Sequence, residues 1–364
     1  MLNNEYYLWS AGLFGARIIS FMKNDIKFKA VIDNNIKKQG TMFHGIPVVS
    51  YEDVKMKLSK AKIVISKVYP AEIQAFLDNE GYIKDQNYFL INDFIPEYYW
   101  NKNESIVFRA VDFAVTTFCN RQCDGCAVFI PYAKKHKHMG VDQLHNELNL
   151  LFSYVDSVMQ LNITVGESTL NKDLPQICNL IYDQYRGRYQ ELIVQTNATV
   201  IPEDADMQNY KNAKTIFALS NYPEHKELTN KFIKQCDNYN VKWYLNPQGG
   251  NRETWIDYGD PRIINERDPA KLRERYSKCL KPGVGLHDGR IYICMVQAYS
   301  HLVAEEGETN KDDAFDINQP VTEKSRKELY ETVIRKSPVK GYLSQCMRCN
   351  GTLKFLKEKH PNDK

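Results

Sequence analysis

The chain lacks the features of a membrane protein and of a nucleic-acid binder. No uninterrupted apolar run reaches the roughly 18 residues that a membrane-spanning helix requires. The residues after Met1 contain no apolar signal-peptide core and no cleavage site. The formal net charge is only +3, and Lys134, Lys135 and Lys137 form a local cluster, not a long basic tail. We therefore expect a cytoplasmic protein with no nucleic-acid or membrane partner, and we interpret those lysines as a solvated loop.

Internal repeats and low-complexity segments are also missing. The 364 residues, 43% hydrophobic and 26% charged, indicate a globular chain that is long enough for two or three domains. The sequence does contain nine cysteines. Thiols stay reduced in the cytosol, so these residues are better interpreted as metal ligands than as disulfides.

The first hundred residues alternate between strand and helix patterns. The segments "YYLWSAG", "FKAVIDNN" and "AKIVISKV" are typical of strands, and "LFGARIISFMKN" has the periodicity of a helix. This order predicts an α/β domain of half-Rossmann type over residues 1–100. The polar, proline-containing stretch "NDFIPEYYWNKNES" that follows is predicted to be a linker.

A glycine turn in this first domain predicts a nucleotide site. The turn "SAGLFG" approximates G-x-G-x-x-G, with Ser10 in the first glycine position and Gly12 and Gly15 in the others. Asp33 ends the second strand about 20 residues later, where a ribose-binding acid belongs. The helix that follows the turn would receive a phosphate at its N-terminus. The alternative is a Rossmann-like scaffold whose ligand site is lost or used for docking.

A second alternation of strands and helices begins near Val107. Its repeated order predicts a parallel sheet, in the form of a partial barrel over residues 107–275, with chemistry at the carboxyl ends of the strands. The expected strands are "VFRAVDFAVTTF", "VMQLNITVGES", "ELIVQTNAT", "KTIFALSNYP" and "VKWYLNPQ", and the expected helices are "DQLHNELNLLFSYVD", "LPQICNLIYDQY" and "KELTNKFIKQCDNY".

Three cysteines lie in the loop after the first of these strands, in the spacing C-x3-C-x2-C. A structural zinc site uses four ligands, and no fourth cysteine is near; His136 and His138 stand ten or more residues further on. Three closely spaced thiolates suit a 4Fe–4S cluster in which one iron stays open to another ligand. The predicted ligands are Cys119, Cys123 and Cys126.

This cysteine motif, together with polar residues at the strand ends, resembles the radical S-adenosylmethionine superfamily. Gly166-Glu167-Ser168 is similar to the G-G-E-P element of that superfamily, although Val165 and Ser168 replace its first glycine and its proline. The resemblance implies that the open iron binds S-adenosylmethionine and that a 5′-deoxyadenosyl radical abstracts hydrogen from the substrate. The residues implied as cofactor contacts are Gly166, Glu167, Ser168, Thr196, Asn197 and Ser220.

The residue before the third cysteine departs from the pattern of the superfamily. It is often aromatic there, whereas this chain has Gly125. A side-chain contact with the adenine ring is therefore lost at this position, and only a backbone contact can remain.

Four further cysteines lie toward the C-terminus. Cys279 and Cys294 flank a predicted hairpin with an Asp-Gly turn, in the spacing C-x9-G-x4-C, and "CMRC" adds Cys346 and Cys349. Four thiolates can hold either a 4Fe–4S cluster or structural zinc. After such a barrel, the first pair resembles the opening of a SPASM domain, without its C-x5-C-x3-C continuation. The resemblance implies the shorter "twitch" form, with one auxiliary cluster, over residues 276–364.

The last two cysteines, Cys178 and Cys236, stand on predicted helices and are interpreted as buried structural thiols. Neither is then placed to return hydrogen to a substrate radical, which favours oxidation over epimerisation. In the resembling enzymes the auxiliary cluster often accepts an electron from the substrate radical, and the net result is conversion of an alcohol into a ketone. Arg252 and His287 are weak candidates for the proton acceptor.

The substrate class comes from a second resemblance, which covers residues 5–95. This part is similar to the nucleotide-sugar-binding domain of sugar acyltransferases, so the predicted substrate is a sugar, a polyol or a nucleotide sugar. The superfamily resemblance implies a flavodoxin- or ferredoxin-type reductant. Three alternatives stay open: a sugar epimerase, a peptide- or protein-modifying enzyme, and a non-enzymatic metal-binding protein.

Overall fold

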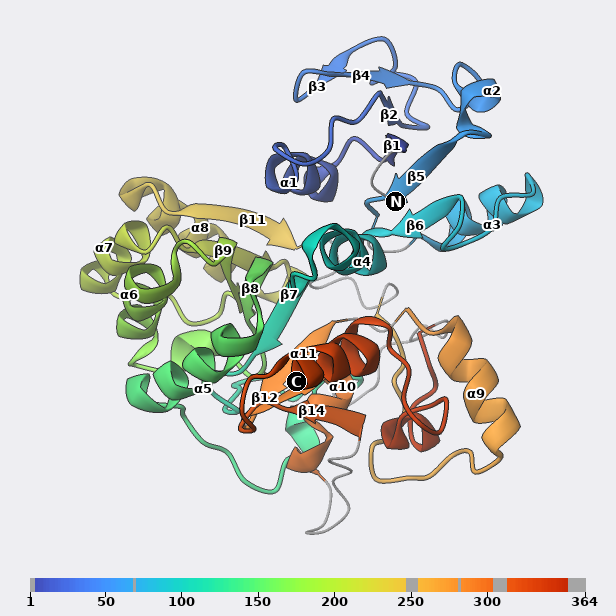
Figure 1. Cartoon of the computed structure of the whole chain (residues 1–364). Coiled ribbons are helices and arrows are strands. Elements are labelled where there is room, and N and C mark those ends of the chain that lie inside the picture. The colour runs from blue at the N-terminus through green and yellow to red at the C-terminus, as the bar shows by residue number, and fades with distance from the viewer. Residues whose placement is uncertain (1–3, 68–69, 247–254, 281–282, 304–312, 353–364) are drawn as a thin grey trace. The chain divides into compact units, whose positions relative to one another are not determined.

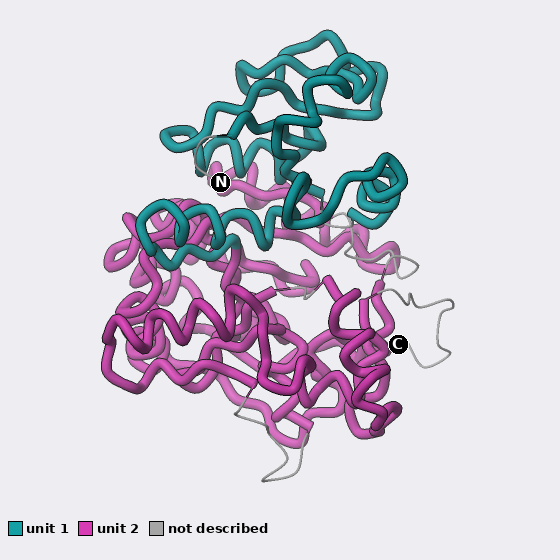
Figure 2. The backbone as a smooth tube through the Cα atoms, turned by 45° about the vertical axis from the view of Figure 1, so that its right-hand side comes forward, with its two compact units in different colours: residues 1–109 teal, residues 110–364 magenta. Residues whose placement is uncertain are grey.

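The computed structural model describes residues 4–67, 70–246, 255–280, 283–303 and 313–352 (Figure 1). The chain divides into two compact units, residues 1–109 and 110–364 (Figure 2). Within the described segments, no helix is long and apolar enough to cross a membrane. The predicted division into three domains stays a prediction, and the two units are described separately below.

The first unit contains a six-stranded sheet in the order β3-β4-β2-β1-β5-β6. β1 is central because it pairs in parallel with both β2 and β5, and only β3 and β4 pair antiparallel. This is the α/β arrangement expected from the sequence, with β1, β2 and β5 at the three predicted strands. The strands are β1 (Glu5–Trp9), β2 (Val31–Ile32), β3 (Met42–Phe43), β4 (Ile46–Val49), β5 (Ala61–Ile65) and β6 (Tyr88–Leu90).

The predicted linker after this sheet is wrong: it forms the helix α4 (Ile91–Asn103), with Pro96 inside it. Proline in a helix interior costs about 3 kcal/mol or more. Packing offsets that cost, because Phe94 and Tyr98 are buried and the Phe94 ring lies 5.3 Å from the ring of Tyr6. The other helices of the unit are α1 (Leu13–Phe21), α2 (Lys55–Leu58) and α3 (Ala71–Asn79).

The second unit contains an eight-stranded sheet in the order β11-β10-β9-β8-β7-β12-β13-β14. The strands from β8 to β11 pair in parallel, as do β7 and β12, whereas β13 pairs antiparallel with β12 and β14. The predicted mixed α/β class is therefore confirmed. The strands are β7 (Val107–Phe113), β8 (Ser157–Ile163), β9 (Tyr189–Thr196), β10 (Ile216–Ser220), β11 (Lys242–Asn246), β12 (Val284–His287), β13 (Arg290–Tyr292) and β14 (Ala314–Asp316).

Helices α5 to α8 connect the parallel strands and lie along the sheet (Figure 1). On α5, Leu144, Leu148 and Leu151 form an apolar stripe at helical spacing that faces the core. The sequence pattern missed α7, which has few apolar residues. The helices of this unit are α5 (Val141–Tyr154), α6 (Leu174–Tyr185), α7 (Asp204–Asn212), α8 (Lys226–Tyr239), α9 (Pro269–Lys278), α10 (Met295–Ala298) and α11 (Glu323–Leu329).

The predicted hairpin between β12 and β13 is confirmed. Its turn residues Asp288 and Gly289 have φ of 50° and 64°, as a tight hairpin turn requires. A Cβ atom on Gly289 would approach Asn318 to 2.4 Å, so glycine is needed there. The 3-10 turns are Ile130–Tyr132, Ser168–Leu170, Pro223–His225, Ser300–Leu302 and Ser344–Met347, and Tyr330–Ile334 forms a π-helical turn.

Candidate metal and cofactor site

The loop after β7 brings the first three cysteines together. Burial, together with the nearby charges of Glu167, Cys123 and Cys126, raises the pKa of the Cys119 thiol to about 12. A thiolate in such surroundings is stable only with a compensating positive charge. Three partly buried soft ligands that interact with one another therefore fit a metal centre.

The backbone around the third cysteine supports the same reading. Burial raises the pKa of the Cys126 thiol, and hydrogen bonds from the backbone of Val128, Phe129 and Ile130 partly reverse that shift. Hydrogen bonds from the surrounding backbone stabilise a metal-bound thiolate and tune the metal. The loop thus presents its sulfur atoms with hydrogen-bond donors already in place.

The end of β8 packs tightly against this loop. Val165 and Gly166 both have positive φ, 79° and 61°. A Cβ atom on Gly166 would come within 2.4 Å of the carbonyl oxygen of Phe118, and the backbone N–H of Glu167 donates to that same oxygen at 2.8 Å. Glycine is required at 166, whereas Val165 adopts a conformation that is unusual for a β-branched residue.

Glu167 joins the ends of β8 and β9. Its side chain is completely buried, and its carboxylate accepts hydrogen bonds from the Thr196 hydroxyl at 2.7 Å and from the Asn197 backbone N–H at 2.6 Å. The backbone N–H and the hydroxyl of Thr169 also donate to it, at 3.1 and 2.6 Å. Burial raises the pKa of this carboxyl group, and these donors partly offset the shift.

Asn197 continues this network to the cysteine loop. Its amide nitrogen donates to Asn120 Oδ1 at 2.9 Å and lies 4.0 Å from the Sγ atom of Cys119. The structure thus brings the predicted residues Glu167, Thr196 and Asn197 next to the first cysteine. Their roles as direct contacts to S-adenosylmethionine stay predictions.

The two predicted serines lie at the same edge of the sheet. Ser168 is completely buried, and within the described residues its hydroxyl has no hydrogen-bond partner. Ser220 ends β10, next to the end of β9, and is half-buried. Both therefore stand at the carboxyl ends of the strands, where the sequence placed the chemistry.

An arginine that sequence reasoning missed contacts the second cysteine. Arg121 Nε lies 3.5 Å from Cys123 Sγ, and the guanidinium carbon lies 3.8 Å from the ring centroid of Tyr222. Arg121 also forms an ion pair of 2.8 Å with Glu224. A positive charge beside a sulfur ligand stabilises negative charge there. The sequence did contain a signal that could have identified it, because Arg121 is a cationic residue between Cys119 and Cys123.

The second set of four cysteines also converges. Burial raises the pKa of the Cys294 thiol, and the nearby Cys279, Cys349 and Cys346 raise it further. The backbone N–H of Gly351 donates to Cys349 Sγ at 3.2 Å. Cys279 follows α9 and Cys294 precedes α10, at the two ends of the segment that contains the hairpin. The role of these four cysteines as ligands of one cluster stays a prediction.

Arg275 on α9 holds the last two cysteines in place. Its Nη1 donates to the carbonyl oxygen of Cys346 at 2.9 Å and to that of Cys349, and also to Asn265 Oδ1 at 3.0 Å. One guanidinium thus links the helix that leads to Cys279 with the "CMRC" segment. The sequence carried no signal for this contact because the partners are backbone carbonyls far along the chain.

Neither cysteine set has the spacing of a site for a single ion. In the segments that the structure describes, no three His, Cys, Asp or Glu side chains are gathered closely enough to hold one metal ion. In a 4Fe–4S cluster each cysteine binds a different iron, so its ligands stand further apart.

Of the two candidate proton acceptors, Arg252 lies outside the described residues. His287 ends β12, which pairs in parallel with β7, so it lies at the same edge of the sheet as the cysteine loop. Its ring stacks on His301 at a centroid distance of 4.0 Å. Burial lowers the pKa of His287, so its imidazole is neutral at pH 7. A role as proton acceptor stays a prediction.

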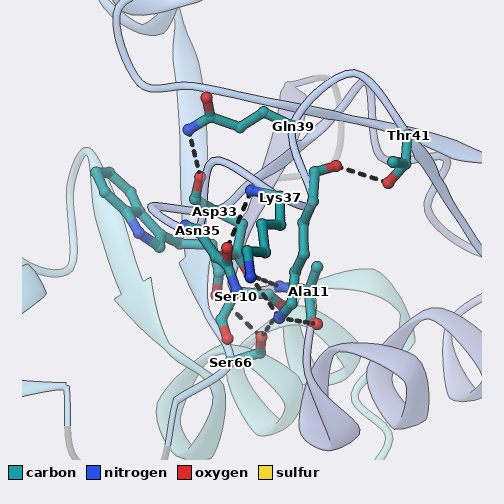
Figure 3. Close-up of polar contacts among 10 residues, drawn as sticks. Ser10, Ala11, Asp33, Asn35, Lys37, Gln39, Thr41 and Ser66 are labelled. Atoms are coloured by element: carbon teal, nitrogen blue, oxygen red, sulfur yellow. Dashed lines mark hydrogen bonds and ion pairs between the residues drawn. The ribbon is translucent and has the colours of Figure 1, made fainter.

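In the first unit, Asp33 is directed at the glycine turn (Figure 3). Its carboxylate accepts hydrogen bonds from the backbone N–H groups of Ala11 at 2.8 Å and Asn35 at 2.9 Å, and it pairs with Lys38 at 3.2 Å. Burial alone would raise the pKa of Asp33, but these donors lower it below its ordinary value.

The turn itself requires Gly15 for close packing, because a Cβ atom there would meet the Ser10 carbonyl oxygen at 2.4 Å. Gly12 precedes α1 with no side-chain cap on the helix. The acid predicted to bind ribose thus already has partners inside the unit, and nucleotide binding at Gly12, Gly15 and Asp33 stays a prediction.

Solved structures that resemble the chain were found at low sequence identity. The chain is similar to BtrN in complex with AdoMet and 2-DOIA, with a TM-score of 0.43, 16% identity, and coverage of 70% of this chain and 98% of that one. It is also similar to native anSMEcpe with bound AdoMet and Cp18Cys peptide, with a TM-score of 0.40, 12% identity, and coverage of 66% and 86%. These are structures of radical S-adenosylmethionine enzymes.

A likeness at these scores concerns the fold. No protein-family model and no curated protein sequence matches the chain. The functional proposal below therefore rests on the residues of the site.

Proposed function

We propose that the chain is an enzyme that holds a 4Fe–4S cluster through Cys119, Cys123 and Cys126 and binds S-adenosylmethionine beside it. The observation that supports this most strongly is the meeting of three thiols with the Glu167–Asn197 network at the carboxyl ends of β7, β8 and β9. When bound, the cluster and the cofactor would supply a carbon-centred radical that removes hydrogen from a substrate.

The residues of the chain provide charge and position for that chemistry. Glu167 is a buried carboxyl group that accepts four hydrogen bonds, which favour its ionised form against the cost of burial, so it would offer negative charge to the ammonium group of the cofactor. Asn197 connects this carboxylate to the cysteine loop through Asn120. Gly166 lets the two segments approach closely, so the cofactor and the sulfur ligands would share one rigid wall.

We further propose that the reaction is the oxidation of an alcohol on a sugar, polyol or nucleotide sugar. Conversion of an alcohol into a ketone removes two electrons and two protons, so it needs an acceptor for the second electron. Cys279, Cys294, Cys346 and Cys349 would hold a second 4Fe–4S cluster for this purpose, whereas zinc could not accept an electron.

The remaining thiols support oxidation over epimerisation. Cys178 on α6 and Cys236 on α8 are completely buried, as predicted, and burial raises the pKa of each to about 12. The other seven of the nine cysteines belong to the two proposed clusters. No thiol is then left to return hydrogen to a substrate radical.

Anaerobic reconstitution followed by metal analysis and turnover tests the proposal. We expect about eight irons per chain, as two four-iron clusters require. We also expect 5′-deoxyadenosine from S-adenosylmethionine with dithionite as reductant. Replacing Cys119, Cys123 and Cys126 together by Ala should abolish that product, and persistence of the product would contradict the first cluster. About four irons with one zinc would contradict the second cluster alone.

A further inference from the structure

A basic surface lies beside the first cysteine. We define it as Phe118 together with the consecutive residues Lys134, Lys135, His136, Lys137 and His138, all of which are exposed to solvent. From Gly125 to Gly140 the sequence contains no aspartate or glutamate. Within the described residues, Lys135 and Lys137 form no ion pair. The five residues from Lys134 to His138 are thus three lysines and two histidines, a local run of basic side chains in a chain with a net charge of only +3.

The segment is held in place against the cysteine loop. The backbone N–H of Thr117 donates to the carbonyl oxygen of Lys137 at 2.9 Å, and the N–H of Lys137 donates to the Thr117 hydroxyl at 2.8 Å. Thr116 and His138 form an antiparallel bridge. The lysines thus have a defined backbone position, which the interpretation as a solvated loop did not anticipate.

Phe118 connects this surface to the candidate metal site. It precedes Cys119 in the chain, and its side chain is 39% exposed, which is unusual for a large apolar residue. Its ring stacks on His138 at 4.6 Å and lies 5.4 Å from the ring of His136. Its carbonyl oxygen, on the inner side, accepts the hydrogen bond from Glu167. One residue therefore contacts both the interior of the site and the surface.

We propose that the basic surface is the docking site for an acidic one-electron carrier protein of the flavodoxin type, which delivers electrons to the metal centre at Cys119. This inference rests on the proposed function, which needs a supply of single electrons. Electron transfer slows steeply with distance, and Phe118 places the surface one residue from a cluster ligand. Exposed lysines around an apolar centre attract an acidic partner and leave a small contact area that allows rapid release.

The test compares two electron donors on the reconstituted full-length protein. Formation of 5′-deoxyadenosine is measured with reduced flavodoxin at increasing concentration and ionic strength, and separately with dithionite. The variant is K135E/K137E, and K135Q/K137Q repeats the test without charge reversal. The matched control is K231E/K234E, which changes the net charge equally through two exposed lysines on α8.

We expect the apparent KM for reduced flavodoxin to rise about tenfold in K135E/K137E at low salt, because steering and docking both weaken. The rate with dithionite should stay within about twofold of the parent, and K231E/K234E should behave as the parent does. Salt should slow the flavodoxin-driven reaction of the parent more than that of the variant. An unchanged flavodoxin dependence in K135E/K137E would overturn the proposal.

Calorimetric titration of oxidised flavodoxin into the same proteins separates the remaining outcomes. If the parent makes no product even with dithionite, the proposed function fails. The docking surface is then judged by binding alone: loss of binding in both lysine variants supports it, and retention overturns it. A short DNA duplex is titrated in parallel, and tighter binding of that duplex, lost in K135Q/K137Q, would identify a nucleic-acid surface and overturn the proposal.

Discussion

Arg121 Nε lies 3.5 Å from Cys123 Sγ while its guanidinium group stacks on the ring of Tyr222 at 3.8 Å. The ion pair with Glu224 fixes the orientation of the group. A cation so placed stabilises the more negative, reduced form of a cluster bound to that sulfur.

Replacing Arg121 with Gln should therefore make the reduction potential of the first cluster more negative. The expected shift is about 60 mV, because loss of a charge-assisted contact worth about 1.4 kcal/mol corresponds to 59 mV for one electron. A redox titration followed by electron paramagnetic resonance measures it. Arg262→Gln is the control, since Arg262 also lies over a tyrosine ring, that of Tyr132, but pairs with Asp260. Equal potentials in parent and R121Q would contradict the prediction.

Replacing Gly166 with Ala should destabilise the second unit by about 2–4 kcal/mol, through the positive φ and the clash with the Phe118 carbonyl oxygen. Chemical denaturation gives the loss of stability, and iron analysis should show less iron per chain. Gly187→Ala is the matched control, because a Cβ atom there meets nothing within 4 Å. Similar stability losses in both variants would show that the close contact is unimportant.

Replacing Arg275 with Met should remove iron from the second cluster only. The hydrogen bonds from Arg275 to the carbonyl oxygens of Cys346 and Cys349 are lost, so those two ligands no longer have a fixed position. We expect the iron content to fall from about eight to about four per chain, with 5′-deoxyadenosine formation retained. Arg273→Met, an exposed position on the same helix, should keep the full iron content. An unchanged iron content in R275M would mean that the hydrogen bonds from Arg275 are not needed for cluster binding.

Glu147 makes the stability of the second unit depend on pH. It is buried, one carboxylate oxygen accepts the backbone N–H of Asp288 at 2.8 Å, and the other has no partner within the described residues. Burial raises the pKa of this group above its unfolded value. The native state then holds its proton more tightly, so stability falls as pH rises from the unfolded pKa through the folded one.

E147Q can keep the hydrogen bond and removes the charge. We expect this variant to be more stable than the parent by about 1 kcal/mol at pH 7, with the difference vanishing near pH 4. Denaturant titrations at several pH values measure the difference. A difference in stability between E147Q and the parent that is constant at all pH values would show that ionisation of Glu147 plays no part.

Replacing Asp33 with Ala should weaken the binding of a nucleotide sugar to the first unit, as measured by calorimetry with UDP-glucose. Because Asp33 also holds the turn through Ala11, K38M serves as a second variant that removes the ion pair and leaves that hydrogen bond. Weakened binding in D33A with binding retained in K38M would support a role of Asp33 at the ligand. If the parent binds no nucleotide sugar, the predicted site is absent.

The segment that was predicted as a linker, and that forms α4, shows where local sequence preferences were insufficient. Pro96 and its polar neighbours predicted a break, but burial of Phe94 and Tyr98 against the sheet of the first unit stabilises a helix there. That packing depends on residues such as Tyr6, far away in the sequence, so propensity alone could not reveal it.

The sequence by itself determined the features that depend on covalent spacing and periodicity. These are the C-x3-C-x2-C loop after a buried strand, the strands β7 to β11 that alternate with helices, and the hairpin that carries Cys279 and Cys294. Parallel strands end at one edge, so residues such as Glu167 and Asn197 could be expected to meet there.

Only the tertiary structure decided what each side chain contacts. Arg121 reaches Tyr222, Arg275 reaches the carbonyl oxygens of Cys346 and Cys349, and Asp33 turns toward Ala11. These partners are far apart in the sequence or are backbone atoms, which carry no sequence signal. Their contacts arise from the packing of the folded chain, because a buried polar group without a hydrogen-bond partner costs free energy and most such groups are therefore paired.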